Sequence, residues 1–321
     1  MLLYLGIIVL VCLALLVLLV FVTSETYAKI VTFEEEKTYL DPLTNELLEF
    51  PSIEDPATVV LSVVVPAYNE EKRLPVMLNE CLGYLEAKVI SDSKFSYELL
   101  IVDDGSTDKT TEVALRYSKQ YGCKKVRVLT LKKNRGKGGA VRLGMLRSRG
   151  KQLLFADADG ATKFEDIIKL QTSLQELIQG KPEEGSLAIV CGSRAHLEKD
   201  AIASRSIFRT FLMKGFHLLV WFFAARSVRD TQCGFKLMTR STARICFPNL
   251  HIERWAFDVE LIYIAEYLRI PTSEVAVRWT EIEGSKIVPV LSWLQMGRDL
   301  ILLWLRYSTG AWKLRPDIKM N

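Results

Sequence analysis

The sequence predicts an α/β fold: a mostly parallel sheet with helices on both faces, an N-terminal transmembrane helix and C-terminal interfacial amphipathic helices. From residue 59 onward, runs of β-branched residues alternate with segments of helical periodicity, which is the pattern of a parallel sheet. An uncharged apolar stretch opens the chain, and tryptophan, leucine and arginine are mixed near its end. We therefore expect an anchor (1–23), a linker or stalk (24–58), an α/β domain (59–286) and an amphipathic membrane-interface segment (287–321).

Composition narrows the class of protein. With 321 residues, of which 49% are apolar and 25% charged, the chain can bury a large core, and disorder is not expected. The formal net charge of +4 is too small for a general attraction to nucleic acid, so we expect no nucleic-acid partner. The six cysteines form no CxxC pair, which indicates reduced thiols in a cytosol-facing domain, although their even number also allows a disulfide.

The first apolar stretch, Leu2 to Val22, has the length that spans a bilayer. A cleaved signal peptide would have a basic start, a shorter apolar region and a small-x-small cleavage site, and the stretch has none of these. We therefore expect a single-pass anchor, with an atypical signal sequence as the alternative. Lys29 and Lys37 follow the stretch and no basic residue precedes it, which slightly favours a cytosolic body. The next residues, up to about Pro56, are acidic and interrupted by prolines, which is typical of a linker.

Four predicted strands end in polar clusters. The strand in VVLSVVVPAYNE precedes a helix in RLPVMLNECLGYLEAKVI, and the strand in YELLIVDDGSTD precedes a helix in TTEVALRYSKQYG. KVRVLTL and QLLFADADG are the third and fourth strands, with a helix in GKGGAVRLGML between them. In sheets of this kind, ligands bind beyond the carboxyl ends of the strands. The clusters at 66–70, 103–108, 134–138 and 157–159 should therefore surround one site.

The residue types in these clusters suit a nucleoside diphosphate. Asp157 and Asp159, one residue apart at the end of a strand, can share Mg²⁺ or Mn²⁺, whose coordination substrate phosphates usually complete. Tyr68 can pack its ring on a base, and Lys137 in NRGKGGA can place a positive charge beside phosphate. The carboxylates of VDDGSTD can accept hydrogen bonds from a pyrimidine N–H and from ribose hydroxyls.

The motifs VVVPAYNE, VDDGSTDKT, NRGKGGAVRLG, FADADG, GSR and DTQCGFK, in this order, resemble glycosyltransferase family 2, the inverting enzymes of GT-A fold. The resemblance runs from about residue 61 to residue 286 and implies a GT-A nucleotide-sugar-binding domain. It also implies transfer of glucose from UDP-glucose to dolichyl phosphate, giving a β-linked lipid sugar for protein N-glycosylation at the endoplasmic reticulum membrane. Mannose transfer from GDP-mannose and a non-catalytic nucleotide-sugar-binding subunit are the alternatives. A processive polysaccharide synthase would need several spanning helices and a QxxRW motif, and neither is visible in the sequence.

The resemblance also assigns individual residues. The positions that match its nucleotide-binding motifs are Pro66, Tyr68, Glu70, Asp103, Asp104, Lys137 and Asp157, with Arg142 as a further candidate. Asp157 and Asp159 match its metal and diphosphate motif, and Asp159 is expected to be catalytic. Related mannosyl enzymes have a glutamine where this chain has Ala161, so the cation has one side-chain ligand fewer. Asp230 in DTQCGFK matches an acid that contacts the sugar or acts as a base, and we expect it to orient the sugar first.

Several residues beyond these motifs have two possible roles. We expect Arg194 and Arg209 to bind the lipid phosphate, because arginine forks match its oxygens, whereas Arg205 also fits the fringe of an interfacial helix. Asp258 and Glu260 fit either the site or the start of a helix, and Trp255 fits either a sugar platform or the core.

Two later stretches suit a membrane surface. TFLMKGFHLLVWFFAARS is apolar but contains Lys214 and His217, which favours the headgroup boundary over a span. PVLSWLQMGRDLILLWLRYSTGAWKLR places Trp293, Trp304 and Trp312 among leucines and arginines, as at the interface of an anionic leaflet. Packing of an ordinary amphipathic helix against the core is the alternative. The sequence gives no indication of the oligomeric state.

Overall fold

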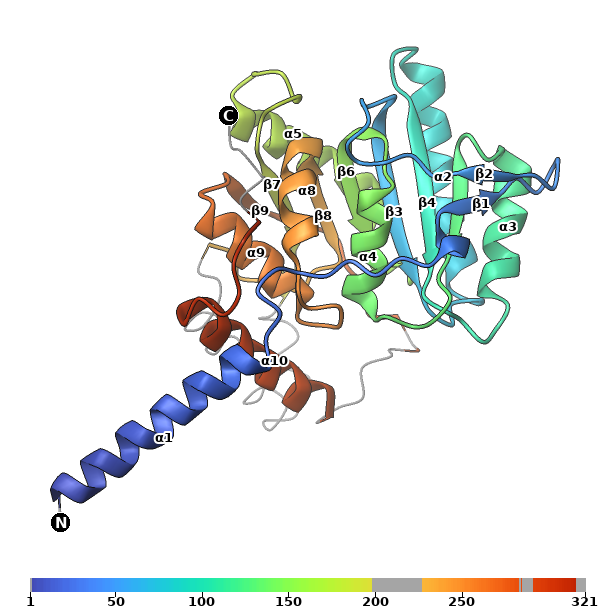
Figure 1. Ribbon diagram of the computed structural model, residues 1–321. Coiled ribbons are helices and arrows are strands. Elements are labelled where there is room, and N and C mark those ends of the chain that lie inside the picture. The colour runs from blue at the N-terminus through green and yellow to red at the C-terminus, as the bar shows by residue number, and fades with distance from the viewer. Residues whose placement is uncertain (1, 198–226, 283, 285–290, 316–321) are drawn as a thin grey trace.

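The computed structural model describes residues 2–197, 227–282, 284 and 291–315 (Figure 1). In this part of the chain seven strands form one sheet with the order β5-β4-β3-β6-β8-β7-β9. The strands are β3 (Val59–Ala67), β4 (Tyr97–Asp103), β5 (Val126–Thr130), β6 (Gly150–Ala156), β7 (Ile189–Ser193), β8 (Phe235–Thr239) and β9 (Thr272–Ala276). All pairs are parallel except the two that β8 makes with β6 and β7. The predicted α/β fold with a mostly parallel sheet is confirmed.

The four strands expected from the sequence are β3 to β6, and they lie side by side. Their order and their parallel pairing place the ends of all four at one edge of the sheet. β8 runs in the opposite direction, so it begins at this same edge, where Phe235 pairs with Ala156. The segment that precedes β8 therefore joins the four strand ends, which the sequence pattern did not predict.

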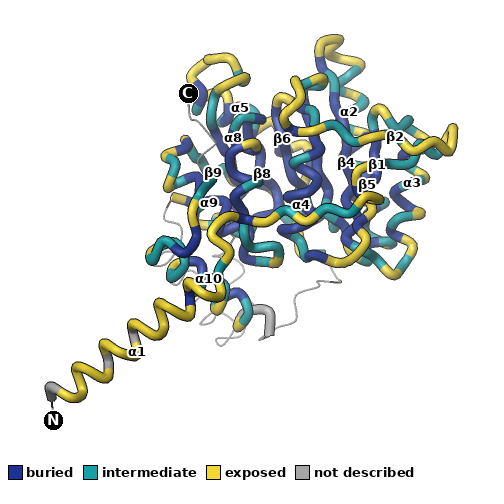
Figure 2. The backbone as a smooth tube through the Cα atoms, viewed as in Figure 1, coloured by how far each residue is buried: buried dark blue, intermediate teal, exposed yellow. Residues whose placement is uncertain are grey.

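Helices cover both faces of the sheet, as expected (Figure 1). One buried cluster packs α2 (Leu74–Ser91), α3 (Thr110–Tyr121) and α5 (Ile167–Ile178) against one face. A second cluster packs α4 (Lys137–Leu146), α8 (Arg240–Cys246) and α9 (Phe257–Tyr267) against the other. Because most of the strands carry apolar side chains on both sides, the sheet is largely buried between the two clusters (Figure 2). Short 3-10 helices at η2 (Phe164–Asp166), η3 (Ala195–Leu197) and η4 (Phe247–Asn249) complete the domain.

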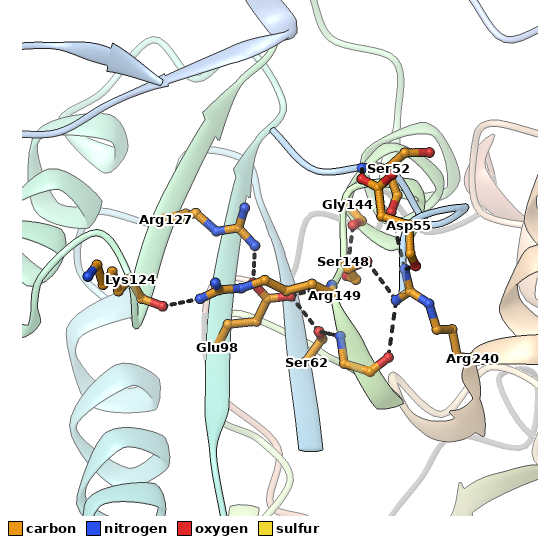
Figure 3. Close-up of polar contacts among 11 residues, drawn as sticks. Ser52, Asp55, Ser62, Glu98, Lys124, Arg127, Gly144, Ser148, Arg149 and Arg240 are labelled. Atoms are coloured by element: carbon orange, nitrogen blue, oxygen red, sulfur yellow. Dashed lines mark hydrogen bonds and ion pairs between the residues drawn. The ribbon is translucent and has the colours of Figure 1, made fainter. Parts of the chain in front are cut away.

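A polar network closes the opposite edge of the sheet, where the strands begin (Figure 3). The fully buried carboxylate of Glu98 binds the guanidinium of Arg127, and it accepts bonds from Nε of Arg149 at 2.9 Å and from the hydroxyl of Ser62 at 2.5 Å. Arg240 donates to four backbone carbonyls, those of Ser52, Asp55, Ser148 and Gly150. Each buried charge thus has partners, which a stable interior requires.

Helix α1 (Leu2–Val22) extends away from the domain, and most of its described side chains are exposed (Figures 1 and 2). Within the described residues, it is the one helix that is long and apolar enough to cross a membrane, with a mean hydropathy of 3.5 over Tyr4–Val22. A signal sequence near an N-terminus meets the same criteria. The single-pass anchor therefore stays a proposal.

Residues 24–58, expected to be a linker, lie against the α/β domain. They contain η1 (Glu34–Glu36) and an antiparallel hairpin of β1 (Thr38–Leu40) and β2 (Leu47–Glu49), and Glu36 and Ile53 are buried. The charge of Glu36 is compensated by Arg135 of the domain at 2.7 Å, a long-range pair that composition cannot reveal. The segment is thus part of the folded body rather than a free spacer.

Helix α10 (Leu291–Ser308) follows the domain and lies near the C-terminal end of α1 (Figure 1). One side of α10 buries Leu300 and Leu303, whereas Leu294 and Ile301 on the other side are exposed, and Trp304, one turn after Leu300, is partly exposed. Beyond the helix, Trp312 is buried and stacks on His251 with 4.0 Å between the ring centroids. One face thus packs on the domain, as the alternative expected, and the other is open, so the membrane interface stays a prediction. All six cysteines are described, and all are free thiols.

Candidate active site

The loops after β3 and β4 bind each other at the edge of the sheet where strands β3 to β6 end. Asn69, whose φ is +54°, accepts a bond on its side-chain oxygen from the Thr107 N–H at 2.8 Å and donates its own N–H to the Ser106 hydroxyl at 2.9 Å. Glu70 forms a two-point ion pair with Arg73. These loops and Gly284 line a hollow of about 380 Å³. The predicted residues Pro66 and Tyr68 lie just before it, and Tyr68 is 38% exposed.

Asp103 and Asp104 are both buried, and both hold loops in place. Asp103 accepts bonds from the Ser106 N–H at 2.9 Å and from the hydroxyl of Thr111. Asp104 accepts the N–H bonds of Arg135 at 2.7 Å and Gly136 at 2.9 Å, one on each oxygen. Burial raises the pKa of Asp104 to about 7, against the lowering effect of these two bonds. The aspartates predicted to contact the nucleotide therefore also shape the loops that would surround it.

Lys137 and the Asp-x-Asp turn meet at the centre of the edge. Nζ of Lys137 lies 2.7 Å from a carboxylate oxygen of Asp157. Burial alone would lower the pKa of Lys137, but Asp157, Asp258 and Asp159 outweigh it and raise that pKa, so the ammonium stays charged. Asp159 accepts a bond from the Ala161 N–H at 2.9 Å. Burial first, and then the nearby Asp157 charge, raise the pKa of Asp159. The two carboxylates thus lie close enough to repel each other.

The turn before β8 packs directly on Asp157. The Asp157 N–H donates to the carbonyl of Gly234 at 3.0 Å, and a Cβ on Gly234 would lie only 2.0 Å from the Asp157 carboxylate. Only glycine leaves room for the acid in this position. This explains the glycine of the DTQCGFK motif by packing.

A second lysine-acid pair lies behind the first. Lys236 and Asp258 are both buried, with 2.5 Å between Nζ and the carboxylate, and Lys236 also donates to the Cys233 carbonyl. The ammonium groups of Lys137 and Lys236 lie 5.9 Å and 5.0 Å from the centroid of the Phe155 ring. From the sequence, Asp258 had two possible roles and Lys236 was not predicted, although a lysine within an apolar run was a signal for it.

Arg194 and Asp230 form one unit at the end of β7. Arg194 donates from Nε and from its terminal nitrogen to the two carboxylate oxygens of Asp230, at 2.7 and 2.8 Å. Its backbone N–H also donates to Asp230, and Glu274 receives the Asp230 N–H at 2.9 Å. Burial would raise the pKa of Asp230, but Arg194 lowers it below its usual value, so the acid stays ionised. Trp279 lies 5.4 Å from the Arg194 guanidinium and, like Glu274, was missed because nothing in the sequence spacing connects it to the motifs.

The other residues that the sequence suggested for the site, where the structure describes them, do not join the contacts given above. Arg142 is buried and donates to the Leu250 carbonyl at 2.6 Å and to Glu253, whose backbone carbonyl contacts the loop before α4. Glu260 accepts bonds from the backbone of His251 and Ile252 and from the hydroxyl of Tyr307, which is a structural role. The expectations for Arg205 and Arg209, and for the stretch with Lys214 and His217, lie outside the described residues.

The donor set of the Asp-x-Asp turn fits a hard divalent cation. Mg²⁺ is usually held by one or two carboxylates and completed by water and substrate phosphates, so Asp157 and Asp159 are enough protein ligands. The described residues hold no group of three or more metal-ligating side chains. An ion here would therefore need oxygens from the substrate to complete its coordination.

A sheet of this topology, with carboxylates and a lysine at its carboxyl edge, defines a nucleotide-sugar transferase of GT-A fold. A model of the family described as glycosyl transferase family 2 matches residues 62–244, and the chain belongs to this family. It is 61% identical to the dolichyl-phosphate beta-glucosyltransferase of Drosophila melanogaster, over 92% of this chain and 90% of that protein. The protein of the same name from Mus musculus is 59% identical, over 94% of this chain and 92% of that protein. The one from Saccharomyces cerevisiae is 42% identical, over 81% of this chain and 78% of that protein. The resemblance found in the sequence is confirmed.

Among solved structures, the chain resembles the Mycobacterium tuberculosis glucosyl-3-phosphoglycerate synthase, with a TM-score of 0.52 and 18% identity. The match covers 79% of this chain and 82% of that one. At this identity, the likeness supports the fold alone.

Proposed function

We propose that this glycosyltransferase transfers glucose from UDP-glucose to dolichyl phosphate, with inversion at the anomeric carbon. The observation that carries the proposal is the 61% identity, over 92% of the chain, to a protein named for this reaction. The charged edge of the sheet supports it independently, because it offers groups for a diphosphate leaving group.

The nucleoside is proposed to lie in the hollow between the loops after β3 and β4. Tyr68 supplies an exposed ring beside it, and Glu70 is held in place there by Arg73. Asp103 and Asp104 act mainly by fixing these loops, since each of their four oxygens already accepts a bond from the protein. The diphosphate would then extend from the hollow towards Lys137, whose ammonium stabilises charge on the leaving group.

Asp157 and Asp159 are the residues that would hold Mg²⁺ or Mn²⁺. When bound, such an ion neutralises charge on the diphosphate. The 2.7 Å ion pair with Lys137 holds the Asp157 carboxylate in place. Because Gly234 has no side chain, it leaves room for this carboxylate.

The acceptor requires no general base, because a phosphate oxygen of dolichyl phosphate is already ionised near neutral pH. We therefore assign Asp230 to orienting the sugar, since Arg194 keeps it charged and fixes both its oxygens. Arg194 is largely neutralised by this pair, so we propose that it positions Asp230 rather than serving as the main ligand of the lipid phosphate. Arg209 remains a proposed ligand of that phosphate.

We further propose that α1 anchors the protein in the endoplasmic reticulum membrane, with the domain in the cytosol. The exposed face of α10, with Leu294, Ile301 and Trp304, would lie in the headgroup region of the same leaflet. A lipid phosphate could then reach the active site without leaving the membrane surface.

The test is a direct assay of the purified full chain. Radiolabelled UDP-glucose or GDP-mannose is supplied with short-chain dolichyl phosphate and Mg²⁺, and the lipid-soluble product is counted. The proposal expects an acid-labile product from UDP-glucose alone. Product from GDP-mannose would instead identify the protein as a mannosyltransferase. A lack of product from either donor, with UDP binding intact, would favour a non-catalytic binding subunit.

A further inference from the structure

The segment between α1 and the hairpin, residues 24–37, crosses the domain surface in front of α4 (Figure 1). We call this segment the strap. One end of the strap is fixed to the stretch that follows α10, where the Lys313 N–H donates to the Thr26 carbonyl at 2.9 Å and Arg315 donates to the Ala28 carbonyl at 2.6 Å. Its other end carries Glu36, which is fully buried.

Glu36 binds the loop between β5 and α4 with both of its carboxylate oxygens. Oε1 accepts the N–H of Lys132 at 3.0 Å, and Oε2 accepts a guanidinium nitrogen of Arg135 at 2.7 Å. A second guanidinium nitrogen of Arg135 donates to the Val31 carbonyl, and the ring of Phe33 lies 5.4 Å from the same guanidinium. Arg135 is therefore held by strap residues from several directions.

The loop that Glu36 holds belongs to the proposed donor site. The N–H groups of Arg135 and Gly136 bind the two oxygens of Asp104, and Lys137, which pairs with Asp157, comes next in the chain. Gly136 has a φ of +87°, and a Cβ there would lie 2.8 Å from the Glu253 carbonyl. The loop thus contacts the strap through Arg135 and residue 253 through Gly136.

We propose that Glu36 is a positioning residue for the sugar-nucleotide site, acting through Arg135 on the loop that carries Lys137. The identity of the nucleotide in this inference rests on the proposed function. The coupling of Glu36 to the loop that carries Lys137 does not. A buried carboxylate costs desolvation free energy that a simple surface attachment would not require, and here it offsets the buried charge of Arg135. The strap, which starts directly after α1, therefore joins the membrane-proximal part of the chain to the donor site.

The test compares two neighbouring glutamates of η1 in the full chain. Glu36→Gln removes the buried charge, while Glu35→Gln removes an exposed charge that reaches Lys132 at 2.9 Å. We expect Glu36→Gln to raise the Kd for UDP with Mn²⁺ about tenfold, and to raise the KM for UDP-glucose similarly, with the KM for dolichyl phosphate unchanged. The Glu35→Gln variant should stay within about twofold of wild type, because exposed pairs contribute little.

A merely structural role gives a different pattern. It would lower the melting temperature of Glu36→Gln but leave the Kd for UDP and both KM values at their wild-type level, and this outcome overturns the proposal. Should Glu36→Gln fail to fold, Arg135→Lys supplies the same test, because it removes the guanidinium fork but keeps the backbone N–H that binds Asp104. A wild-type Kd for UDP in that variant equally refutes the role of the strap.

The two proposals fail separately. If the wild-type chain makes no glucosyl lipid, the proposed function is wrong, but the Kd of the variants for whichever nucleotide the wild-type chain binds, UDP or GDP, still decides the role of Glu36. If the wild-type chain is active and Glu36→Gln binds UDP normally, the strap proposal alone is wrong.

Discussion

Substitution of Gly234 by alanine tests the centre of the proposed site with one methyl group. A Cβ at this position would lie 2.0 Å from a carboxylate oxygen of Asp157 and 2.2 Å from its carboxyl carbon, whereas real contacts stay above 3.0 Å. The shortfall is about 1 Å. The backbones cannot separate easily, because the Asp157 N–H donates to the Gly234 carbonyl at 3.0 Å. The easiest response is therefore a rotation of the Asp157 side chain away from β8.

This rotation is expected to cost activity far more than stability. It breaks the 2.7 Å contact between Lys137 and Asp157, and it displaces one of the two proposed metal ligands. A displacement of about 1 Å at a reacting group can reduce the rate about 100-fold. That factor corresponds to about 2.7 kcal/mol of activation free energy. The core of the domain is untouched, so the melting temperature should change little.

The assay is transfer of radiolabelled glucose to short-chain dolichyl phosphate, with Mn²⁺ affinity measured in the presence of UDP. Gly83→Ala is the matched control, because nothing lies within 4 Å of a Cβ at that position of α2. It should keep wild-type activity, and alanine should even stabilise the helix slightly. If Gly234→Ala retained wild-type kcat/KM and Mn²⁺ affinity, Asp157 would not need its observed position, and the reasoning would be refuted.

Three further outcomes are expected. Asp159→Asn should reduce transfer at least about 100-fold with an unchanged melting temperature, and wild-type activity in this variant would remove the metal assignment. The affinity for UDP-glucose, measured by calorimetry from pH 5.5 to 8.5, should fall as the pH drops through about 7, because a protonated Asp104 no longer accepts both loop N–H bonds. An affinity for UDP-glucose that does not change with pH would contradict this role of Asp104. The Asp104→Asn variant should show no change of affinity near pH 7. Glu98→Ala leaves Arg127 and Arg149 without their buried carboxylate, so it should destabilise the fold by about 3 kcal/mol. The kcat of the folded enzyme should stay unchanged. An unchanged melting temperature would refute the structural role of Glu98.

The sheet was predictable because its signals are local. Each strand from β3 to β6 is a mostly apolar run that is followed by polar residues, and the alternation with helices leaves few arrangements besides a parallel sheet. The clustering of the strand ends then follows from topology. Lys137 and Asp157 could be placed in one site for this reason, although their 2.7 Å contact could not.

Pairings between distant segments were not predictable. Arg194 was expected to bind a lipid phosphate, and Asp230 to contact the sugar, yet they bind each other across 36 positions of sequence. A single sequence shows neither the partner of a charged residue nor whether that charge is buried. The same holds for Lys236, which is fully buried against Asp258, 22 positions further along the chain.

The region 24–58 illustrates how composition can mislead about a connecting segment. Acidic residues and prolines are typical of solvated linkers, and most of the glutamates here are indeed exposed. One of them, Glu36, is buried because the loop it meets carries Arg135, whose charge also needs a partner. Charge complementarity between segments far apart in sequence therefore converted an apparent spacer into part of the catalytic domain. The same physical reason makes the strap testable, because each side of a buried ion pair depends on the other.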